Sequence, residues 1–316
     1  MLTRKWAFCV TTAAGTVPAC TRRRLHYRYN RSLPSTLYPR MDLVLQGSDI
    51  ETADLKRIAK LARARRIERF TAEAFRLEAA HENSDIPAAC EYARIDYAYV
   101  PEGRRLVDFR LLVMDMDSTL ITIETIDELA DLVGFKTEVA AITEAAMRGE
   151  IEYNESLKRR VAVLKGLPEE ALQRVYDERV KLTPGADKLL SAARRAGMKT
   201  LLVSGGFTYI TERLKSRLHL DYARSNCLEL ADGKLTGNIV GDIVNADGKR
   251  DALIEVRDRL GLQRDQIIGI GDGANDLKFM AECGVSIAYH AKPIVRGHTT
   301  HAINYVDLSG VLNLFH

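Results

Sequence analysis

The sequence lacks the features that define several classes of protein. Its 316 residues contain no uninterrupted run of the ~18 apolar residues that a membrane-spanning helix needs, so we expect no membrane partner. The five cysteines are scattered and form no Cys-x-x-Cys pair, which argues against a disulfide scaffold or zinc site and predicts a reducing, cytoplasmic location. With 46% hydrophobic and 28% charged residues, the composition is that of a globular protein. The length suggests two domains, or one large domain with insertions.

Acidic residues are absent from the first 40 positions, although the whole chain is nearly balanced in charge. The 46 Lys and Arg residues against 43 Asp and Glu residues give a net charge of +3. Residues 41–316 alone carry 38 basic and 43 acidic side chains, a net charge of −5. A slightly acidic body argues against nucleic acid as a partner.

Residues 1–40 show no sustained hydrophobic periodicity and hold three of the eight prolines. We predict that they form a disordered leader, or translated sequence upstream of a true start at Met41. Their beginning imitates an export signal, with a basic Met1–Lys5 and a weakly apolar stretch at 6–17. Threonines dilute that stretch and Arg22–Arg24 follow it, so export is the weaker alternative.

Residues 41–105 are predicted to form a small α+β domain that ends in a turn-like linker. The expected elements are a strand at Met41–Gln46, a helix through Leu55 and Ala62 capped by Ser48 or Asp49, a strand within Arg66–Leu77, a helix at Pro87–Ile95 and an extended segment at Tyr97–Val100.

Residues 106–316 alternate strands and helices, which is typical of a parallel α/β sheet. The expected strands are Leu111–Met114, Leu201–Val203, Ile267–Ile270 and Ser286–Tyr289. The first two are separated by some 85 residues, too many for a simple crossover, and we predict a helical cap inserted at about 122–183. Its expected helices are 123–133, 138–148 with Thr137 as its cap, 154–165 with Asn154 as its cap, and 168–180. A hairpin is expected to turn at Asp232-Gly233.

Polar side chains follow the predicted strands, at the sheet edge where α/β proteins bind ligands. Asp115 and Asp117 come directly after the first strand, where two carboxylates are costly without a metal ion or a proton between them. A carboxylate there could attack phosphorus, and the second could pass a proton to the leaving oxygen.

Three further motifs fit phosphate and metal chemistry. Ser204-Gly205-Gly206 offers a hydroxyl and unshielded backbone N–H groups, although such a motif alone is more often a turn. Lys249 supplies a point charge for phosphoryl oxygens, and alone it would be read as a surface lysine. Gly271-Asp-Gly-Ala-Asn-Asp276 carries acidic oxygens that suit Mg²⁺.

In this order, these four motifs resemble those of the haloacid dehalogenase superfamily of phosphatases. Residues 110–313 further resemble its phosphoserine phosphatase family, through Asp117-Ser-Thr-Leu-Ile-Thr-Ile-Glu124, Glu155-Ser-Leu-Lys-Arg-Arg160 and Val203-Ser-Gly-Gly-Phe207. The resemblance implies a Rossmann-like sheet with a helical cap, preceded by an ACT-like domain that could be regulatory. The implied activity is Mg²⁺-dependent hydrolysis of O-phosphoserine through an aspartyl-phosphate, the last step of serine biosynthesis.

The resemblance also implies a role for each matched residue. Asp115 would be the nucleophile and Asp117 the general acid and base, and Mg²⁺ would be held by Asp115, the Asp117 carbonyl and Asp272. The implied substrate contacts are Ser204, Gly205, Lys249 and Asn275 for the phosphoryl group, Glu124 and Arg160 for the ammonium and carboxylate, and Tyr153, where the family usually has Phe, closing the site.

Spacing supports one of the cap residues independently. Arg160 completes an apolar stripe on helix 154–165, so its guanidinium needs an anionic partner, either a substrate carboxylate or a carboxylate of the cap. Glu124 shares its helix face with Glu128 and Asp131, which could form a solvated face. Thr125 and Lys278 lie beside matched positions and are not expected to touch the chemistry.

Two rival functions stay open at this point. One is the same chemistry on another small phosphate ester, or phosphoryl transfer to an alcohol. The other is a regulatory binding protein with a vestigial site. The sequence leaves the oligomeric state undetermined, with a homodimer as one expectation.

Overall fold

The computed structural model describes residues 40–316, so the predictions for residues 1–39 lie outside the described part. The first elements are β1 (Met41–Gln46), α1 (Thr52–Leu61), β2 (Arg66–Arg69), β3 (Ala74–Glu78), α2 (Ile86–Tyr92) and β4 (Asp96–Pro101). Their strands form an antiparallel sheet in the order β2-β3-β1-β4. The predicted α+β unit is therefore present as a βαββαβ arrangement.

Alternation along β1 explains how this sheet is buried on both faces. Leu43 and Leu45 pack with the apolar sides of α1 and α2. Val44, which points to the other face, belongs to the core that continues into the rest of the chain.

Two local predictions for this unit are wrong. The single strand expected within Arg66–Leu77 is two strands, because residues 70–73 turn the chain so that β2 pairs antiparallel with β3. Helix α1 is capped neither by Ser48 nor by Asp49; it starts after Glu51, whose side chain makes no capping hydrogen bond.

The remainder of the chain is built on seven strands and the helices between them. In chain order, the longer elements are β5 (Leu111–Met114), α3 (Thr125–Leu132), α4 (Lys136–Met147), α5 (Tyr153–Val163), α6 (Glu169–Glu178), α7 (Ala186–Arg195), β6 (Lys199–Phe207), α8 (Thr208–Leu218), β7 (Tyr222–Ala231), β8 (Lys234–Val240), α9 (Ala246–Arg259), β9 (Ile267–Gly271), α10 (Leu277–Met280), β10 (Val285–Tyr289), α11 (Pro293–Arg296) and β11 (His301–Ile303). The sheet has the order β11-β10-β9-β5-β6-β7-β8, in which only β8 pairs antiparallel to its neighbour.

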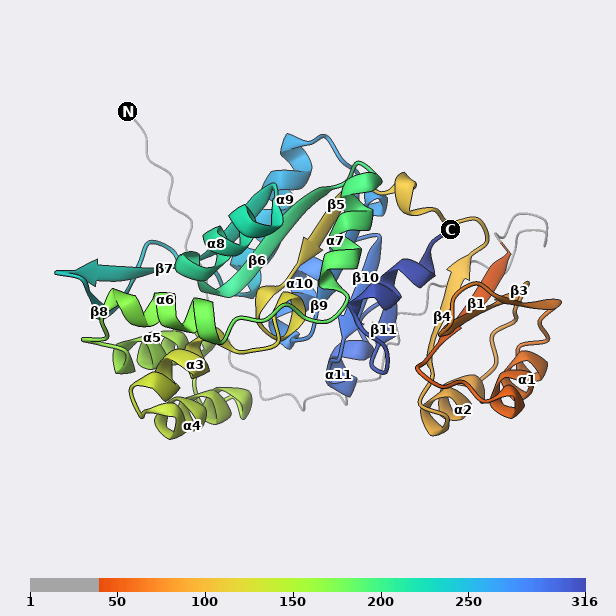
Figure 1. The fold of residues 1–316 in the computed structure, drawn as a ribbon, viewed down its shortest axis with the longest axis horizontal. Helices are drawn as coiled ribbons and strands as arrows, with labels where there is room; N and C mark the ends of the chain where they lie inside the picture. The colour runs from red at the N-terminus through yellow and green to blue at the C-terminus, as the bar shows by residue number, and fades with distance from the viewer. Residues whose placement is uncertain (1–39) are drawn as a thin grey trace, which may run out of the picture. The chain divides into compact units, whose positions relative to one another are not determined.

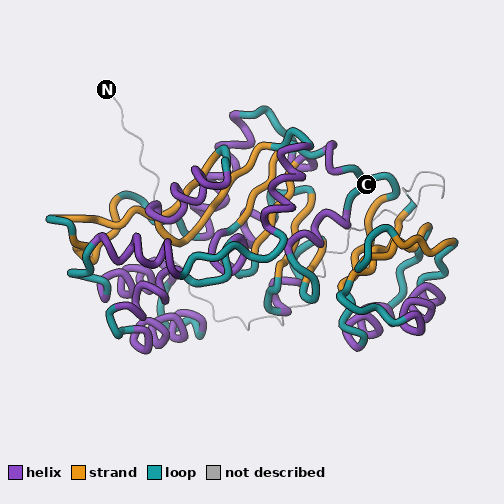
Figure 2. The backbone as a smooth tube through the Cα atoms, in the orientation of Figure 1, coloured by secondary structure: helices purple, strands orange, loops and turns teal. Residues whose placement is uncertain are grey.

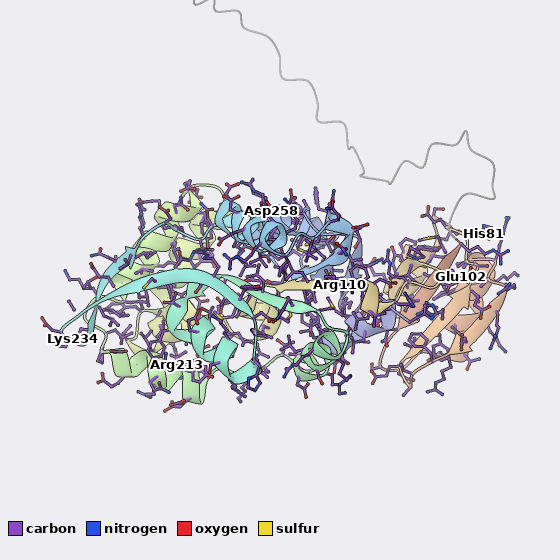
Figure 3. All side chains as sticks on the ribbon, turned by 90° about the horizontal axis from the view of Figure 1, so that it is seen from above. His81, Glu102, Arg110, Arg213, Lys234 and Asp258 are labelled. Carbon is purple, nitrogen blue, oxygen red and sulfur yellow. The ribbon has the colours of Figure 1, made fainter. Side chains whose placement is uncertain are left out.

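Helices cover both faces of this sheet, as its strand sequences require. In β5, Leu112 and Met114 pack into the core that includes α8, whereas Leu111 and Val113 pack into the core that includes α9. Figure 3 shows Arg213 of α8 and Asp258 of α9 on opposite sides of the sheet. A strand buried on both faces reads as a continuous apolar run, which explains why β5 was recognisable.

Helices α3 to α6 form one helical insertion between β5 and β6 (Figures 1 and 2). A bridge between Ile121 and Leu182 closes its two connections to the sheet. The β7–β8 hairpin turns at Asp232-Gly233 as predicted, and its Leu235 accepts a backbone hydrogen bond from Gly166, between α5 and α6, at 2.8 Å.

The predicted strands and insertion helices are present, with three local corrections. Strand β6 is longer than expected and runs through the Ser204-Gly205-Gly206 motif, which was predicted to follow it. Helix α4 starts after Phe135 rather than Thr137, and α5 starts after Glu152 rather than Asn154. Glu152 caps α5 by accepting from the Asn154 backbone N–H at 2.9 Å.

A buried polar contact joins β4 to the end of the chain. The Asp96 carboxylate accepts backbone hydrogen bonds from Asn304 and Tyr305, each at 2.8 Å, and from Val306 at 3.3 Å. Burial raises the pKa of Asp96, while these donors act to lower it. Satisfying a buried carboxylate with backbone donors makes the 304–306 loop the specific partner of β4.

His301 makes the stability of the fold dependent on pH. Its imidazole is buried, with Nε2 3.1 Å from Arg104, and burial together with the charge of Arg104 lowers its pKa to about 3. Between pH 6.5 and 3 the imidazole of His301 is protonated in the unfolded chain but neutral in the folded one. The free energy of unfolding is therefore highest above pH 6.5 and decreases as the pH falls through this range.

We therefore expect His301→Gln to remove ~2 kcal/mol of the stability difference between pH 7 and pH 5, because each pKa unit corresponds to ~1.4 kcal/mol. Urea unfolding at the two pH values measures this difference. His298→Gln, at an exposed position, should behave like the native chain. Equal acid sensitivity of His301→Gln and the native chain would show that His301 does not titrate this way.

Candidate active site

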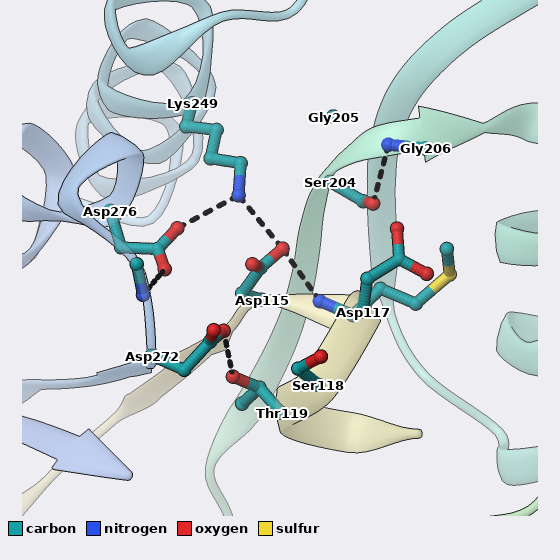
Figure 4. Close-up of polar contacts among 12 residues, drawn as sticks. Asp115, Asp117, Ser118, Thr119, Ser204, Gly205, Gly206, Lys249, Asp272 and Asp276 are labelled. Carbon is teal, nitrogen blue, oxygen red and sulfur yellow. Dashed lines mark hydrogen bonds and ion pairs between the residues drawn. The ribbon is translucent and has the colours of Figure 1, made fainter. Parts of the chain in front are cut away.

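The candidate site lies at the carboxyl ends of three adjacent parallel strands, β5, β6 and β9 (Figure 4). Asp115 directly follows β5, Ser204 lies in the last part of β6, and Asp272 directly follows β9. Lys249 reaches this edge from the first turn of α9. The sheet order therefore brings together residues that are far apart in the sequence.

A buried ammonium group joins two of the carboxylates. Lys249 Nζ lies 2.8 Å from Asp115 Oδ1 and 2.8 Å from Asp276 Oδ1, and its side chain is 1% exposed. Burial alone would lower the pKa of Lys249, but the two carboxylates raise it above its ordinary value. Lys249 is thus a fixed positive charge beside Asp115, and not the solvated surface lysine that it would resemble in isolation.

Three carboxylates could hold a metal ion. One oxygen each of Asp115, Asp272 and Asp276 lies within 4.8 Å of the others. Burial, together with the neighbouring carboxylates, raises the pKa of Asp115, and it raises the pKa of Asp272 to about 6. Clustered buried carboxylates are costly without a cation, and oxygen ligands of this kind fit a hard divalent ion. Thr119 orients the cluster by donating from Oγ1 to Asp272 at 3.0 Å.

The metal ligands expected from the sequence did not include Asp276. The sequence signal was present, because Asp276 is the second acid of the motif that contains Asp272. Which of the two would face the ion depends on the tight turn after β9. A Cβ atom on Gly271 would lie 2.5 Å from Asp276, so only glycine lets the Asp276 side chain fold back against β9.

Asp117 is held in a different environment from Asp115. Its Oδ1 accepts from the Thr125 backbone N–H at 3.1 Å, and its Oδ2 accepts from the Thr125 hydroxyl at 3.3 Å. Burial, with a contribution from Glu124, raises the pKa of Asp117 to about 8. A carboxyl group with this pKa can carry a proton at neutral pH and so act as a general acid. Thr125, which was expected to lie outside the chemistry, therefore contacts the carboxyl group predicted to be the general acid and base.

The Ser204-Gly205-Gly206 segment lies close to Asp117 and to Tyr153 of the insertion. The Ser204 hydroxyl accepts from the Gly206 backbone N–H at 2.8 Å. A Cβ atom on Gly206 would lie 2.8 Å from Asp117 Oδ2, and a Cβ atom on Gly205 would collide with the Tyr153 hydroxyl. Glycines at both positions leave space beside Asp117, which fits a cradle for a phosphoryl group.

The insertion contributes Glu124, Tyr153 and Arg160. Glu124 accepts from the Ser118 hydroxyl at 2.7 Å, and Tyr153 starts α5 beside Gly205. The charge of Arg160 acts to lower the pKa of both Glu124 and Tyr153, although burial raises both. Lys249 at the sheet edge also acts to lower both pKa values, so charges of the insertion and of the sheet edge act on the same groups.

Arg160 has a buried donor without a partner. Among the described residues, its Nε makes no hydrogen bond, and no ion pair joins Arg160 to a carboxylate. The alternative that Arg160 pairs with a carboxylate of the insertion is thus wrong in this structure. Glu128 and Asp131, which share the Glu124 face, pair instead with Arg179 at 2.7 and 3.4 Å.

Two other residues beside the motifs are accounted for. The Asn275 side-chain oxygen lies against Gly273 within the turn that follows β9. Lys278 forms an exposed ion pair with Asp247 at 2.7 Å, which agrees with its expected absence from the chemistry.

Two further observations concern the described residues. Their cysteines, Cys90, Cys227 and Cys283, are free thiols. None of their helices is long and apolar enough to cross a membrane.

Comparisons with known proteins agree with this fold. A family model described as haloacid dehalogenase-like hydrolase matches residues 112–281, more than half of the chain, which defines the class of protein. A second model, described only as a domain of unknown function (DUF4072), matches residues 43–86.

Phosphoserine phosphatase from Polaromonas sp. strain JS666 is 54% identical over 215 residues, which cover 66% of this chain and 91% of that protein. A crystal structure of a probable phosphoserine phosphatase from Vibrio cholerae has a TM-score of 0.76 and 35% identity, and the match covers 87% of this chain and 86% of that one. A substrate-bound phosphoserine phosphatase structure has a TM-score of 0.62 and 35% identity, covering 66% of this chain and 99% of that one. The chain belongs to the phosphoserine phosphatase family of the haloacid dehalogenase-like hydrolases.

We expect the acidic cluster to make Mg²⁺ a stabilising ligand. At about ten times its dissociation constant, Mg²⁺ should stabilise the native chain by ~1.4 kcal/mol, and Asp272→Asn should abolish most of that gain. Thermal unfolding with and without MgCl₂ measures the effect. Asp247→Asn, which changes an exposed carboxylate outside the cluster, should retain it. Equal stabilisation of Asp272→Asn and the native chain would contradict the assigned metal site.

Proposed function

We propose that this chain hydrolyses O-phosphoserine to serine and inorganic phosphate through an aspartyl-phosphate on Asp115, with Mg²⁺ as cofactor. The observation that carries the proposal is the contact of Asp115 with the buried ammonium group of Lys249, at 2.8 Å. Asp117, two residues later, has a pKa that allows it to carry a proton at neutral pH. One carboxylate is kept beside a fixed positive charge, and the other can carry a proton. This division of roles is what an aspartate nucleophile and its general acid require.

The reaction needs two steps from the residues of this chain. In the first, an oxygen of Asp115 forms a bond to phosphorus while the bond from phosphorus to the serine oxygen breaks, and Asp117 gives that oxygen its proton. In the second, Asp117 takes a proton from water as the water oxygen attacks phosphorus, which releases Asp115 and phosphate. Lys249 stabilises the charge on the phosphoryl oxygens in both steps.

Mg²⁺ would be held by Asp115 and Asp272, with the Asp117 carbonyl, and Asp276 is a further candidate ligand in the same cluster. When bound, the ion supplies additional positive charge for the phosphoryl oxygens. Ser204 and Gly205, with Asn275, would bind and position the phosphoryl group.

Recognition of serine is proposed to depend on the insertion, which would act as a cap. The unpartnered Arg160 Nε supports a carboxylate ligand, because a buried guanidinium donor is costly when it stays unpaired. Glu124 would accept the ammonium group, and Tyr153 would close the site. A zwitterionic amino acid satisfies both charges of this pair at once, which a sugar phosphate does not.

The βαββαβ unit at residues 41–101 supports the further proposal of an ACT-like regulatory domain, since this element order is that of ferredoxin-like folds. We also propose that this reaction is the last step of serine biosynthesis, that the protein is located in the cytoplasm and that it forms a homodimer.

We expect Asp115→Asn to reduce phosphoserine turnover by ~10⁴-fold or more, because the amide preserves the shape of the side chain but is not a nucleophile. Phosphate release measures turnover. After an acid quench, the native enzyme should carry covalently bound phosphate and the Asp115→Asn variant should carry none. Asp251→Asn, at an exposed position, is the matched control. Undiminished turnover by Asp115→Asn would reject the proposed intermediate, and no phosphate release by the native enzyme with Mg²⁺ would favour a vestigial binding protein.

We expect Arg160→Ala to raise KM for phosphoserine by ~100-fold while changing hydrolysis of phosphate esters without a carboxylate much less, because a charge-assisted pair contributes ~2–3 kcal/mol. Arg159→Ala is the matched control, since its neighbouring guanidinium pairs with Glu155 on the exposed face of the same helix. If Arg160→Ala leaves phosphoserine turnover intact and sugar phosphates are preferred, the substrate is a different small ester.

A further inference from the structure

We infer that Thr125 is a positioning residue that orients the Asp117 carboxyl group for proton transfer, and that it ties this orientation to the first helix of the insertion. The inference rests on the proposed function, because it assigns Asp117 the role of proton donor. It adds a residue whose part in the reaction was not expected from the sequence.

The geometry gives Thr125 both contacts with the carboxyl group. Its backbone N–H donates to Asp117 Oδ1 at 3.1 Å and its hydroxyl donates to Oδ2 at 3.3 Å. Among the described residues, no other hydrogen-bond donor contacts this carboxyl group. Thr125 is fully buried, so both of its donor groups are shielded from water.

The two oxygens of Asp117 have different surroundings, and Thr125 keeps them apart. Oδ2 is the oxygen that faces Gly206, at the segment proposed to hold the phosphoryl group. A carboxyl group rotates readily about its last torsion, so an unheld group would present either oxygen, or neither, to the leaving oxygen. With Oδ1 bonded to a backbone N–H, the proton is directed from Oδ2.

Thr125 is also the first residue of α3, whereas Asp117 follows β5 by three positions. The bond therefore runs between the insertion and the sheet edge. Thr125 belongs to the insertion, directly after Glu124 and before Arg160 in the sequence. Asp117 is therefore oriented when the first turn of α3 lies against the sheet edge.

The leaving group distinguishes positioning from a merely structural role. The serine oxygen leaves as a strongly basic alkoxide unless it is protonated, so phosphoserine hydrolysis depends on a well-placed acid. p-Nitrophenolate is a weak base and leaves without a proton. A misplaced Asp117 should slow the first reaction and spare the second.

The experiment compares kcat/KM for phosphoserine and for p-nitrophenyl phosphate in Thr125→Val, Thr125→Ser and Thr122→Val. Thr125→Val keeps the shape and the backbone donor but removes the hydroxyl. It should slow phosphoserine hydrolysis about tenfold, the effect of losing one hydrogen bond, and p-nitrophenyl phosphate less than twofold. Thr125→Ser should stay within about twofold of the native ratio, and so should Thr122→Val, at an exposed threonine of the same segment.

The ratio of the two rates is independent of the fraction of enzyme that folds, so a destabilised variant still gives an answer. Equal loss on both substrates, no loss on either, or failure of Thr125→Ser to restore the ratio would overturn the inference. If the native enzyme does not hydrolyse phosphoserine, the proposed function fails instead, and the same ratio is then measured with the alkyl phosphate that it does hydrolyse.

Discussion

Lys249 buries its ammonium group between Asp115 and Asp276, 2.8 Å from an oxygen of each. A buried charge of this kind is tolerable only when its partners are held in place, and each partner is useful only while the lysine stays charged. The carboxylates raise the pKa of Lys249, and this keeps the positive charge permanently beside the proposed nucleophile. The remaining features of the site are arranged around that constraint.

The sheet topology explains how three distant segments satisfy it. Strands β5 and β9 are parallel neighbours, so Asp115 and the turn that carries Asp272 and Asp276 leave the sheet at the same edge. Helix α9 packs with β6 and with the turn after β9, and from there Lys249 reaches between the two carboxylates. A shift of register between β5 and β9 would separate the buried ammonium group of Lys249 from its counterions. The ion pairs therefore favour the correct strand register in addition to forming part of the site.

Much of this arrangement could be predicted from the sequence, because its elements carry strong local signals. Strand β5 is a short apolar run followed by Asp115, and a strand of this kind must be covered on both faces. Asp115 and Asp272 directly follow strand ends, and Arg160 lies on the apolar stripe of a helix, so their spacing is informative.

The missed features depend on contacts that no local pattern records. Thr125 is an ordinary first-turn residue of α3 by sequence, and only the return of the chain past Asp117 gives its hydroxyl a role. The split between β2 and β3 is another such case, because pairing of the two strands with each other, not their composition, decides where the turn falls. Likewise, β6 continues through Ser204 because β7 pairs with it again at Phe207.

The two proposed catalytic carboxyl groups differ mainly in what surrounds them. Asp115 contacts a buried ammonium group, whereas the hydrogen-bond donors of Asp117 are the neutral groups of Thr125, and the charge of Glu124 acts to raise its pKa. Burial raises the pKa of both groups, but for Asp115 the adjacent Lys249 opposes that rise through direct contact, although only one residue separates the two aspartates in sequence. Since its hydrogen-bond donors come from α3, the Asp117 carboxyl group is held by the insertion, whereas the Asp115 carboxyl group is held by Lys249 at the sheet edge. A phosphate ester held between them would bridge the same two parts of the chain, so substrate binding and placement of the acid would stabilise one arrangement of the insertion.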